Sequence, residues 1–535
     1  MKTSKKVLTM LMAAGLTASA LTACSSESNG NQLSSLSAEG SGSAAASSAG
    51  NANGKKVGIT VSMFDRGAVA ADEGSYENNR WTKWINENAP AAVKWVPVPR
   101  NEAQTKLNTL IASGSAPDLM WDYDRNYIAQ LANNGAIQPI GDYIEKYSTT
   151  YKNYLNEHPE LKSYLNIDSK MYAVASVRGP EAIANHGIWI RQDWLDKLNL
   201  QAPTTVDELI EVARKFRDED PDGDGKKNTV PIVFNGNGNT IMRSFFQTHE
   251  NQWYLEGDKL EFGRVNDRTK DYLAFQKQLF DEGLIDKEYI TDKNFQRATQ
   301  FWTTGQAGIL LGAWNMENEF MDLKKNVPTA KMTAMEPVAS KYGKSGLYQE
   351  TPANIYVTFN SQMKEDKIEA AIKYLDWMLD SGWKPLKYGE ENVHYKLVDG
   401  VPQTIDAAKF KQEVAYASEY AVVNQYALKP EWFPTMAASD AISQEYAKEK
   451  ANSLSVAMKN EYRRDIAYNP SLPEVSELVA TFAPIAVQIE TKVVTGAMTP
   501  DAGMVEIRKE WNRLGGENVE KLVNEWYQAN KDQLK

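Results

Sequence analysis

Short apolar runs alternate with longer stretches of helical periodicity from residue 57 onward. The apolar runs have the length and the β-branched and aromatic content of buried strands. Between them, apolar residues recur at helical spacing, as Leu107, Leu110 and Ile111 do before Gly114. This alternation predicts an α/β architecture with mainly parallel strands. The predicted strands cover residues 57–63, 93–98, 118–120, 171–176, 187–190, 230–234, 307–311 and 353–359.

Thr205 and Glu208 mark the start of a helix. A Thr followed three residues later by Glu forms a capping box, in which each side chain accepts a hydrogen bond from a free backbone N–H. The apolar residues behind this pair, from Val206 to Phe216, lie on one helical face. Further helices are predicted at about 79–88, 102–112, 127–132, 193–198 and 368–379, and the chain beyond 379 is predicted to be mostly helical.

The first 24 residues have the pattern of an export signal. Three lysines within the first six residues precede an apolar run at 7–16, which is too short to span a bilayer as a mature helix. Residues 21–24, Leu-Thr-Ala-Cys, then resemble the bacterial lipobox. We therefore expect a lipoprotein signal peptide over 1–23 and a lipid on Cys24. The alternative is an ordinary secretory signal with an incidental cysteine.

The next segment is predicted to be a flexible tether. Residues 25–56 consist mainly of Ser, Gly, Ala and Asn, which bury too little apolar surface to offset the entropy of ordering. Together with Cys24 they would hold a globular body at the outer face of the cell membrane. Every later apolar stretch is interrupted by charge, so we expect no further membrane span.

The composition narrows the chemistry that we expect. The chain has 535 residues, 42% hydrophobic and 24% charged, with a net charge of −11 and no long basic run. This acidic balance argues against nucleic acid as a partner. A single cysteine excludes a disulfide framework and a thiolate metal cluster, and four histidines leave little for zinc or triad chemistry.

Several sequence blocks follow the lipobox in a characteristic order. They include a Gly-x-x-Pro-Asp motif, an aromatic Gly-Ile-Trp-Ile-Arg run and a glycine-rich segment that ends in Trp314. Together they resemble the family 1 extracellular solute-binding proteins of ABC importers, in particular the larger oligosaccharide-binding lipoproteins. The blocks lie at 113–125, 135–140, 170–174, 187–195, 203–208 and 305–314.

The resemblance implies a two-lobed, type II periplasmic-binding-protein-like fold with hinge strands and a ligand cleft. The first lobe would comprise 57–180 and about 352–382, and the second about 181–351 and 383–535. The resemblance also implies a monomer that hands its ligand to an ABC permease and ATPase on other chains.

Polar and aromatic residues follow the predicted strands. In open α/β sheets, ligands bind beyond the carboxyl ends of strands, and aromatic rings beside carboxylates, amides and guanidinium groups suit sugars. Arg66 and Arg100 are equally compatible with interlobe ion pairs; if they face the cleft, an acidic sugar is favoured over a neutral one. Trp121 and Trp314 are either sugar platforms or core residues. The candidate ligand residues are Asp65, Arg66, Arg100, Trp121, Asp122, Asp124, Arg125, Asn235, Trp314 and Asn315.

Residues 220–228 have the spacing of a calcium loop. Oxygen donors stand at positions 1, 3, 5 and 9, with Gly225 at position 6, but Pro231 replaces the bidentate Glu at position 12. In the similar solute-binding proteins such a loop ends in Asp-Glu, which is replaced here by Asn-Thr. We expect a structural Ca²⁺ ion and no redox or organic cofactor; the alternative is a solvated acidic turn. The predicted ligands are Asp220, Asp222, Asp224, the carbonyl of Lys226, and Asn228.

The favoured hypothesis from the sequence is therefore a non-enzymatic, lipid-anchored receptor that captures an oligosaccharide. Motifs of serine hydrolases, zinc proteases and nucleotide-binding proteins are absent from the sequence. A secreted polysaccharide hydrolase or lyase is the alternative, since paired carboxylates are plentiful. A surface adhesin without an importer is the third hypothesis.

Overall fold

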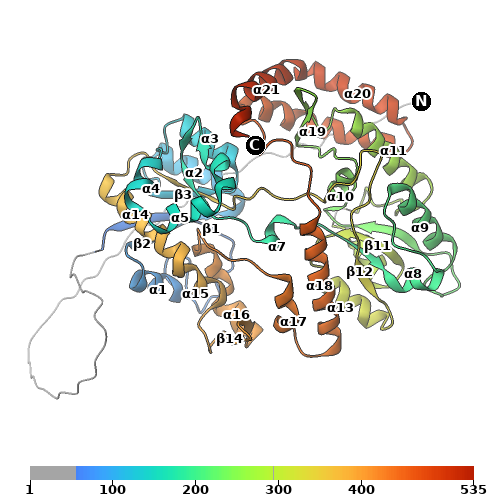
Figure 1. The fold of residues 1–535 in the computed structure, drawn as a ribbon, viewed down its shortest axis with the longest axis horizontal. Coiled ribbons are helices and arrows are strands. Elements are labelled where there is room, and N and C mark those ends of the chain that lie inside the picture. Colours follow the sequence, from blue (N-terminus) through green and yellow to red (C-terminus); the bar gives the residue numbers. More distant parts are fainter. Residues whose placement is uncertain (1–55, 293, 535) are drawn as a thin grey trace, which may run out of the picture. The chain divides into compact units, whose positions relative to one another are not determined.

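The structure of the protein is a computed structural model that describes residues 56–292 and 294–534. The predicted signal peptide, Cys24 and nearly all of the predicted tether lie outside these residues. Figure 1 shows the order of the elements along the chain.

A five-stranded sheet forms the centre of the first lobe. Its strand order is β2 (Ala92–Pro99), β1 (Gly58–Asp65), β3 (Leu119–Asp122), β13 (Tyr356–Phe359) and β6 (Ala173–Val174). β1 is parallel to both β2 and β3, whereas β13 is antiparallel to β3 and β6. β13 belongs to a segment that returns to this sheet after all four strands of the second sheet have formed.

Helices surround the first sheet, and small hairpins join some of them (Figure 1). The helices are α1 (Arg80–Asn88), α2 (Ala103–Ala112), α3 (Arg125–Asn133), α4 (Gly141–Tyr147), α5 (Thr150–Glu157), α6 (Lys162–Leu165), α14 (Glu365–Trp377), α15 (Trp383–Tyr388) and α16 (Ala407–Glu413). The hairpin strands are β4 (Asn166–Ile167), β5 (Lys170–Met171), β14 (Tyr395–Val398) and β15 (Val401–Thr404).

A four-stranded sheet forms the centre of the second lobe. Its order is β12 (Met332–Ala334), β7 (Gly187–Arg191), β11 (Ala307–Gly312) and β8 (Val230–Phe234), and only the β11–β8 pair is parallel. The sequence predicted mainly parallel strands, so the expectation holds for part of each sheet only. The remaining elements of this region are α7 (Pro180–Ile183), α8 (Gln192–Leu198), α9 (Val206–Asp218), α10 (Gly238–Phe245), β9 (Trp253–Glu256), β10 (Lys259–Phe262), α11 (Asp267–Asp281), α12 (Gln296–Thr303), α13 (Glu317–Asn326), α17 (Phe433–Met436), α18 (Ala441–Lys459), α19 (Pro473–Val494), α20 (Pro500–Arg513) and α21 (Gly516–Asn530).

Local sequence signals agree with the elements that form. α9 begins with the predicted capping box: Thr205 Oγ1 accepts from the Glu208 N–H at 3.2 Å, and Glu208 Oε2 accepts from the Thr205 N–H at 3.3 Å. The apolar face of α9 is buried at Leu209, Ala213 and Phe216. In the part of the chain that the structure describes, no helix has the length and apolarity needed to span a bilayer.

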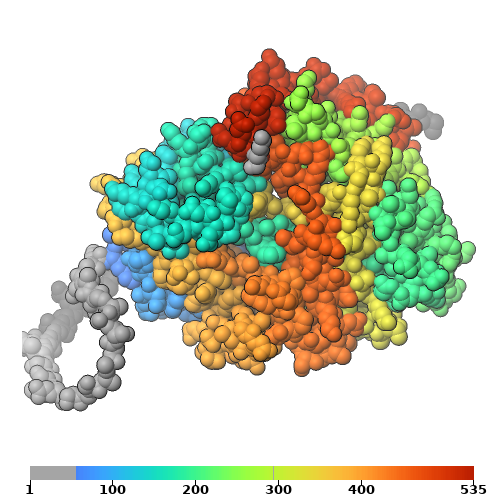
Figure 2. All heavy atoms as spheres, viewed as in Figure 1, coloured from blue at the N-terminus to red at the C-terminus, as the bar shows by residue number. Residues whose placement is uncertain are grey.

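The first lobe contains more of the C-terminal chain than the sequence predicted. We expected its last segment to end near residue 382, but Trp383, Leu386 and apolar residues of 414–423 pack in the first core. α15 follows α14 through a single π-helical turn, so the chain stays on the same lobe. Trp81 of α1 donates from Nε1 to the carbonyl of Glu413 at 2.6 Å, and in Figure 2 orange residues adjoin the blue surface. The predicted boundary at 382 is therefore wrong.

Two antiparallel segments connect the lobes. Val177 and Ala353 form a β-bridge, and the Arg178 N–H donates to the carbonyl of Pro352 at 2.8 Å. Further along, the Glu350 N–H donates to the carbonyl of Ile183 at 2.9 Å. Such paired connections, which leave each lobe with its own core, are where rotation of one lobe against the other is accommodated.

Candidate functional site

The carboxyl ends of β1 and β2 bring two arginines to one sheet edge. The strands are paired in register to their last residues, Asp65 and Pro99, so Arg66 and Arg100 emerge side by side. The Arg100 guanidinium carbon lies 4.8 Å from the ring centroid of Phe64. The ring supports the guanidinium from one side and leaves its N–H groups available.

Tyr123, just after β3, completes this edge. Arg66 donates from Nη2 to the Tyr123 hydroxyl at 3.3 Å, and the Arg100 guanidinium carbon lies 5.3 Å from the Tyr123 ring centroid. Burial raises the pKa of Tyr123, and the negative charge of Glu419 raises it further. The charges of Arg66, Arg100 and Arg178 act in the opposite direction. The phenol therefore stays protonated among several charged groups.

Glu419 contacts Arg66 from a distant part of the chain. Its Oε1 accepts from Arg66 Nε at 2.8 Å, and its side chain is 15% exposed against 38% for Arg66. Burial raises the pKa of Glu419, while Arg66, Lys387 and Arg100 oppose that rise. Burial also lowers the pKa of Lys387, which Glu419 and Glu181 oppose. The sequence analysis missed Glu419 and Lys387, because both lie in the segment that was assigned to the other lobe.

Arg178 is held at the junction between this edge and the connecting segments. Its Nε donates to the carbonyls of Thr351 and Ala353, both at 3.0 Å, and its Nη2 donates to that of Asn354 at 3.3 Å. These bonds to backbone oxygens fix the guanidinium without neutralising its charge. No sequence motif marks Arg178; only the pairing of residues 177–178 with 352–353 reveals it.

Trp121 lies in the core instead of offering an open ring face. It is 2% exposed, its Nε1 donates to the Ser62 carbonyl at 2.7 Å, and its ring centroid lies 4.1 Å from that of Phe64. β3 lies between β1 and β13, and all four of its residues are buried. Of the two alternatives left open for Trp121, its burial favours the core residue, and its ring supports Phe64, which underlies Arg100.

The residues after Trp121 are engaged within the first lobe. Asp122 Oδ1 accepts from the Asp124 N–H at 2.8 Å and from Gln104 Nε2 at 3.4 Å, and burial raises the pKa of Asp122. Asp124 caps α3 by accepting from the Asn126 N–H at 2.9 Å. The two aspartates therefore have different local roles.

Arg125 has other partners than Arg66 and Arg100 have. It donates from Nη2 to the Asn166 carbonyl at 2.6 Å and from Nη1 to Ser471 Oγ at 3.2 Å. Its guanidinium carbon lies 3.5 Å from the ring centroid of Tyr468. Burial lowers the pKa of Arg125. The structure thus gives this candidate a contact with the C-terminal segment.

On the second lobe, the candidates at the strand ends are largely satisfied by protein groups. Trp314 is 8% exposed, stacks on Phe433 with centroids 5.7 Å apart, and donates from Nε1 to the Glu181 carbonyl at 3.0 Å. Asn315 Oδ1 accepts from the Tyr446 hydroxyl at 2.6 Å, and Asn235 Oδ1 accepts from the Asn237 N–H at 3.0 Å. Phe433 and Tyr446 also line a cavity of about 290 Å³ beside these residues.

A second aromatic cluster contains two buried histidines. The Tyr348 ring stacks on His249 with centroids 4.8 Å apart and meets His186 edge-on at 5.5 Å. Burial lowers the pKa of each histidine to about 4, so both rings are neutral near pH 7. These residues carry no sequence motif, and the sequence analysis did not select them.

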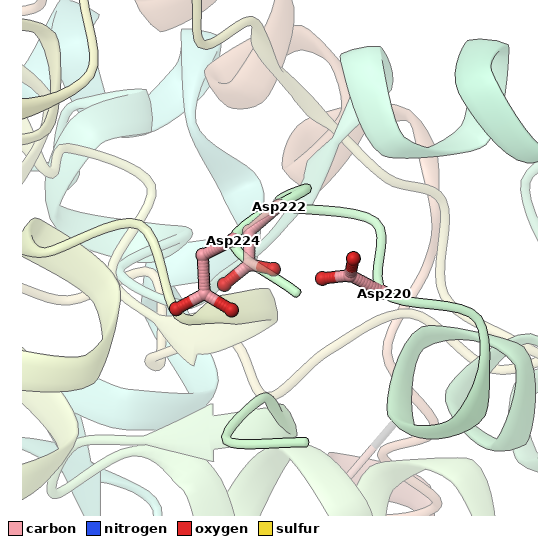
Figure 3. A group of neighbouring side chains, drawn as sticks. All are labelled: Asp220, Asp222 and Asp224. Carbon is pink, nitrogen blue, oxygen red and sulfur yellow. The ribbon is translucent and has the colours of Figure 1, made fainter. Parts of the chain in front are cut away.

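The predicted calcium loop connects α9 to β8 and brings its acidic side chains together. One oxygen from each of Asp220, Asp222 and Asp224 lies within 4.8 Å of the others, and Figure 3 shows Asp220 facing the other two. Burial raises the pKa of Asp222, and the neighbouring Asp220 and Asp224 add to the rise. The Oδ1 atoms of Asp220, Asp222 and Asn228 are buried without a hydrogen-bond partner. Oxygen donors in this state fit a hard divalent cation.

Two α/β lobes, paired connecting segments and polar strand ends define a two-lobed binding-protein fold. The family model for bacterial extracellular solute-binding proteins matches residues 70–385, which is more than half of the chain. The chain belongs to this family, as the order of its sequence blocks predicted.

Individual relatives agree with this assignment. The polygalacturonan/rhamnogalacturonan-binding protein YtcQ of Bacillus subtilis (strain 168) is 28% identical over 325 residues, covering 58% of this chain and 61% of YtcQ. The fructooligosaccharide ABC transporter substrate-binding protein FusA of Streptococcus pneumoniae is 35% identical over 199 residues, covering 34% of this chain and 37% of FusA. The match thus spans less than two thirds of either relative.

Solved structures share the fold. An HMO-binding, ABC-transporter-associated solute-binding protein from Bifidobacterium longum infantis has a TM-score of 0.69 at 18% identity, covering 90% of this chain and 100% of that chain. An EF-hand mutant of FusA in complex with fructo-nystose has a TM-score of 0.60 at 18% identity, covering 89% and 99%. The predicted two-lobed α/β fold is confirmed.

Proposed function

We propose that the protein is a receptor that captures an oligosaccharide between its lobes and delivers it unchanged to a membrane permease. One observation carries this proposal: in a member of the solute-binding family, arginines, a phenol and a carboxylate gather at the strand ends of the first lobe, next to the connecting segments. YtcQ and FusA are both named for carbohydrates that they bind.

The proposed mechanism is closure of the lobes around the ligand. The ligand would first bind Arg66, Arg100 and Tyr123, with Asp65 beside them, and then contact the second lobe near Asn235, Trp314 and Asn315. A ligand that contacts both lobes favours the closed state by its differential affinity for that state. The permease and ATPase on other chains would recognise the closed form, and the receptor would act as a monomer.

Stabilisation measured together with product analysis tests this proposal. The chain from residue 25 onward is mixed with a panel of oligosaccharides, its melting temperature is recorded, and the sugars are then analysed by mass spectrometry. We expect one class of oligosaccharide to raise the melting temperature and to be recovered intact. New reducing ends or unsaturated products would instead identify a hydrolase or a lyase, and the absence of any stabilising sugar would contradict the proposal.

We also propose that Cys24 carries a lipid that holds the protein at the outer face of the cell membrane. The proposal rests on the lipobox-like Leu-Thr-Ala-Cys sequence and on the position of this cysteine, the only one in the chain. Two acyl chains make anchoring stable, at about 0.8 kcal/mol per buried methylene. Cells that express the protein should incorporate an alkyne-labelled palmitate into it, and Cys24→Ala should abolish that label and release the protein from the membrane fraction.

The loop at 220–228 is proposed to hold a structural Ca²⁺ ion. Asp220, Asp222, Asp224 and Asn228 would supply side-chain oxygens, and Lys226 its carbonyl. A divalent cation would relieve the repulsion between the carboxylates and use the three buried oxygens that lack a partner. FusA, whose EF-hand mutant has been solved, supports the assignment. Calorimetric titration of the metal-free protein with Ca²⁺ should show one binding event, and Mg²⁺ at the same concentration should show a weaker one.

A further inference from the structure

The charges at the edge formed by β1, β2 and β3 are only partly compensated. Arg66 is paired with Glu419, but the side chain of Arg100 makes no hydrogen bond or ion pair with any residue in the described ranges 56–292 and 294–534. Arg178 uses Nε and Nη2 on backbone carbonyls, and its Nη1 donates to no described residue. Two guanidinium groups near Tyr123 therefore keep donors available.

The acidic residues at this edge do not fill those donors. Asp124 caps α3, and Asp122 accepts from Gln104 and from its own chain. Asp65 accepts from the Gly67 N–H at 2.8 Å. Glu419 is already bound to Arg66. Each of these carboxylates has another partner, and Arg100 is exposed, so its guanidinium donors are accessible to an acceptor from a ligand.

The chemistry of guanidinium indicates what that acceptor is. Arginine has five donors and no acceptor, and its planar fork matches a carboxylate in a bidentate arrangement. The hydroxyls of a neutral sugar satisfy such a fork only in part and leave its charge uncompensated. The Phe64 and Tyr123 rings hold Arg100 in place, which lowers the entropy lost when it binds a ligand.

We propose that the captured oligosaccharide is anionic, with a uronic-acid carboxylate bound by Arg100 and Arg178 beside Tyr123. This inference rests on the proposed receptor function and names the substrate class of the same site. A sulfate ester on a neutral sugar presents a related anion, so the experiment includes it separately.

Matched ligands test the inference. Calorimetry compares each member of a panel of oligouronates with its carboxyl-reduced counterpart of the same linkage and length, and with a sulfated neutral oligosaccharide. We expect at least one oligouronate to bind at least tenfold more tightly than its reduced counterpart. Raising the salt concentration should weaken the binding of the oligouronate and leave the binding of its reduced counterpart unaffected. Tight binding of the sulfated sugar alone would retain the anion site but overturn the uronate assignment.

Variants connect the effect to the proposed residues. Arg100→Gln should lower the affinity for the acidic ligand by a factor of about 10–100 and change the affinity for the reduced ligand by no more than about twofold. Arg100→Lys should restore part of the loss, because it keeps the charge without the fork. Arg513→Gln, a change at an exposed arginine of α20, is the control and should alter neither. An unchanged melting temperature confirms that each variant is folded.

The outcomes separate the two proposals. If reduced or neutral sugars bind as tightly as acids, and Arg100→Gln changes nothing, the protein is a receptor and the anionic inference is wrong. If no sugar in either panel binds, the receptor function itself is contradicted.

Discussion

At the strand ends of the first lobe, the guanidinium groups of Arg66 and Arg100 remain partly accessible to solvent. At the strand end of the second lobe, by contrast, the side chains of Trp314 and Asn315 form hydrogen bonds with other protein groups. Both regions end α/β sheets at the position where ligands usually bind. In the proposed mechanism, the first lobe would supply charge and selectivity, and the second lobe would supply a surface for closure.

Among single substitutions, truncating Trp121 should produce the largest effect, on folding. Trp121→Ala empties a buried site and removes the support of Phe64, so we expect a loss of about 3–5 kcal/mol in the free energy of unfolding. Denaturant unfolding followed by circular dichroism measures it. Trp432→Ala, at a partly exposed tryptophan, is the control and should cost about 1 kcal/mol or less. A stable Trp121→Ala variant with impaired sugar binding would instead show that Trp121 contacts the ligand.

Acid should charge the second lobe and destabilise it. His186 and His249 have pKa values of about 4 in the folded chain against about 6.5 when unfolded, so the unfolded state binds more protons between these values. Above pH 6.5 the two histidines do not lower the free energy of unfolding. As the pH falls towards 4, this free energy decreases by up to about 3 kcal/mol per histidine. Melting curves from pH 7 to 4 should show this loss.

Histidine variants identify the source of the acid effect. His249→Gln should flatten the decline of melting temperature with pH, because one titrating group is removed. Equal slopes for the wild type and His249→Gln would show that other groups cause the destabilisation.

Removing calcium should have a smaller effect, confined to the second lobe. With Ca²⁺ in excess, binding to the folded state contributes about 1–3 kcal/mol. A chelator should therefore lower the melting temperature by several degrees, and added Ca²⁺ should reverse the change. Asp222→Asn should abolish the response to Ca²⁺, whereas Asp532→Asn, at an exposed position, should preserve it. A melting temperature that is indifferent to the chelator would show that the loop folds without an ion.

The smallest expected effect is a gain of affinity at the first lobe. Glu419→Gln removes the acidic partner of Arg66 and one negative charge, so an anionic ligand should bind about 3–10-fold more tightly. Calorimetry with the best oligouronate measures the gain, and Glu461→Gln, at an exposed residue, is the control. Weaker binding in Glu419→Gln would mean that Glu419 accepts hydrogen bonds from the sugar itself.

The sequence by itself determined the features that depend on neighbours along the chain. Apolar runs predicted β1, β2, β7, β8 and β11, and the Thr205–Glu208 pair predicted the start of α9. The spacing of Asp220, Asp222 and Asp224 predicted that their oxygens converge. Arg66 and Arg100 were selected because each lies within three residues of the end of a predicted strand. All of these depend on contacts within about a dozen residues, which periodicity and spacing describe.

Only the tertiary structure decided which distant residues meet. Glu419 reaches Arg66 across 353 positions, and Arg178 is fixed by carbonyls at 351–354. The burial of Trp121 depends on β13, which follows all four strands of the second sheet along the chain. Sequence patterns report whether a residue is apolar or charged, but not which segment covers it. Burial, ion pairing and the choice of lobe therefore follow from long-range packing of the folded chain.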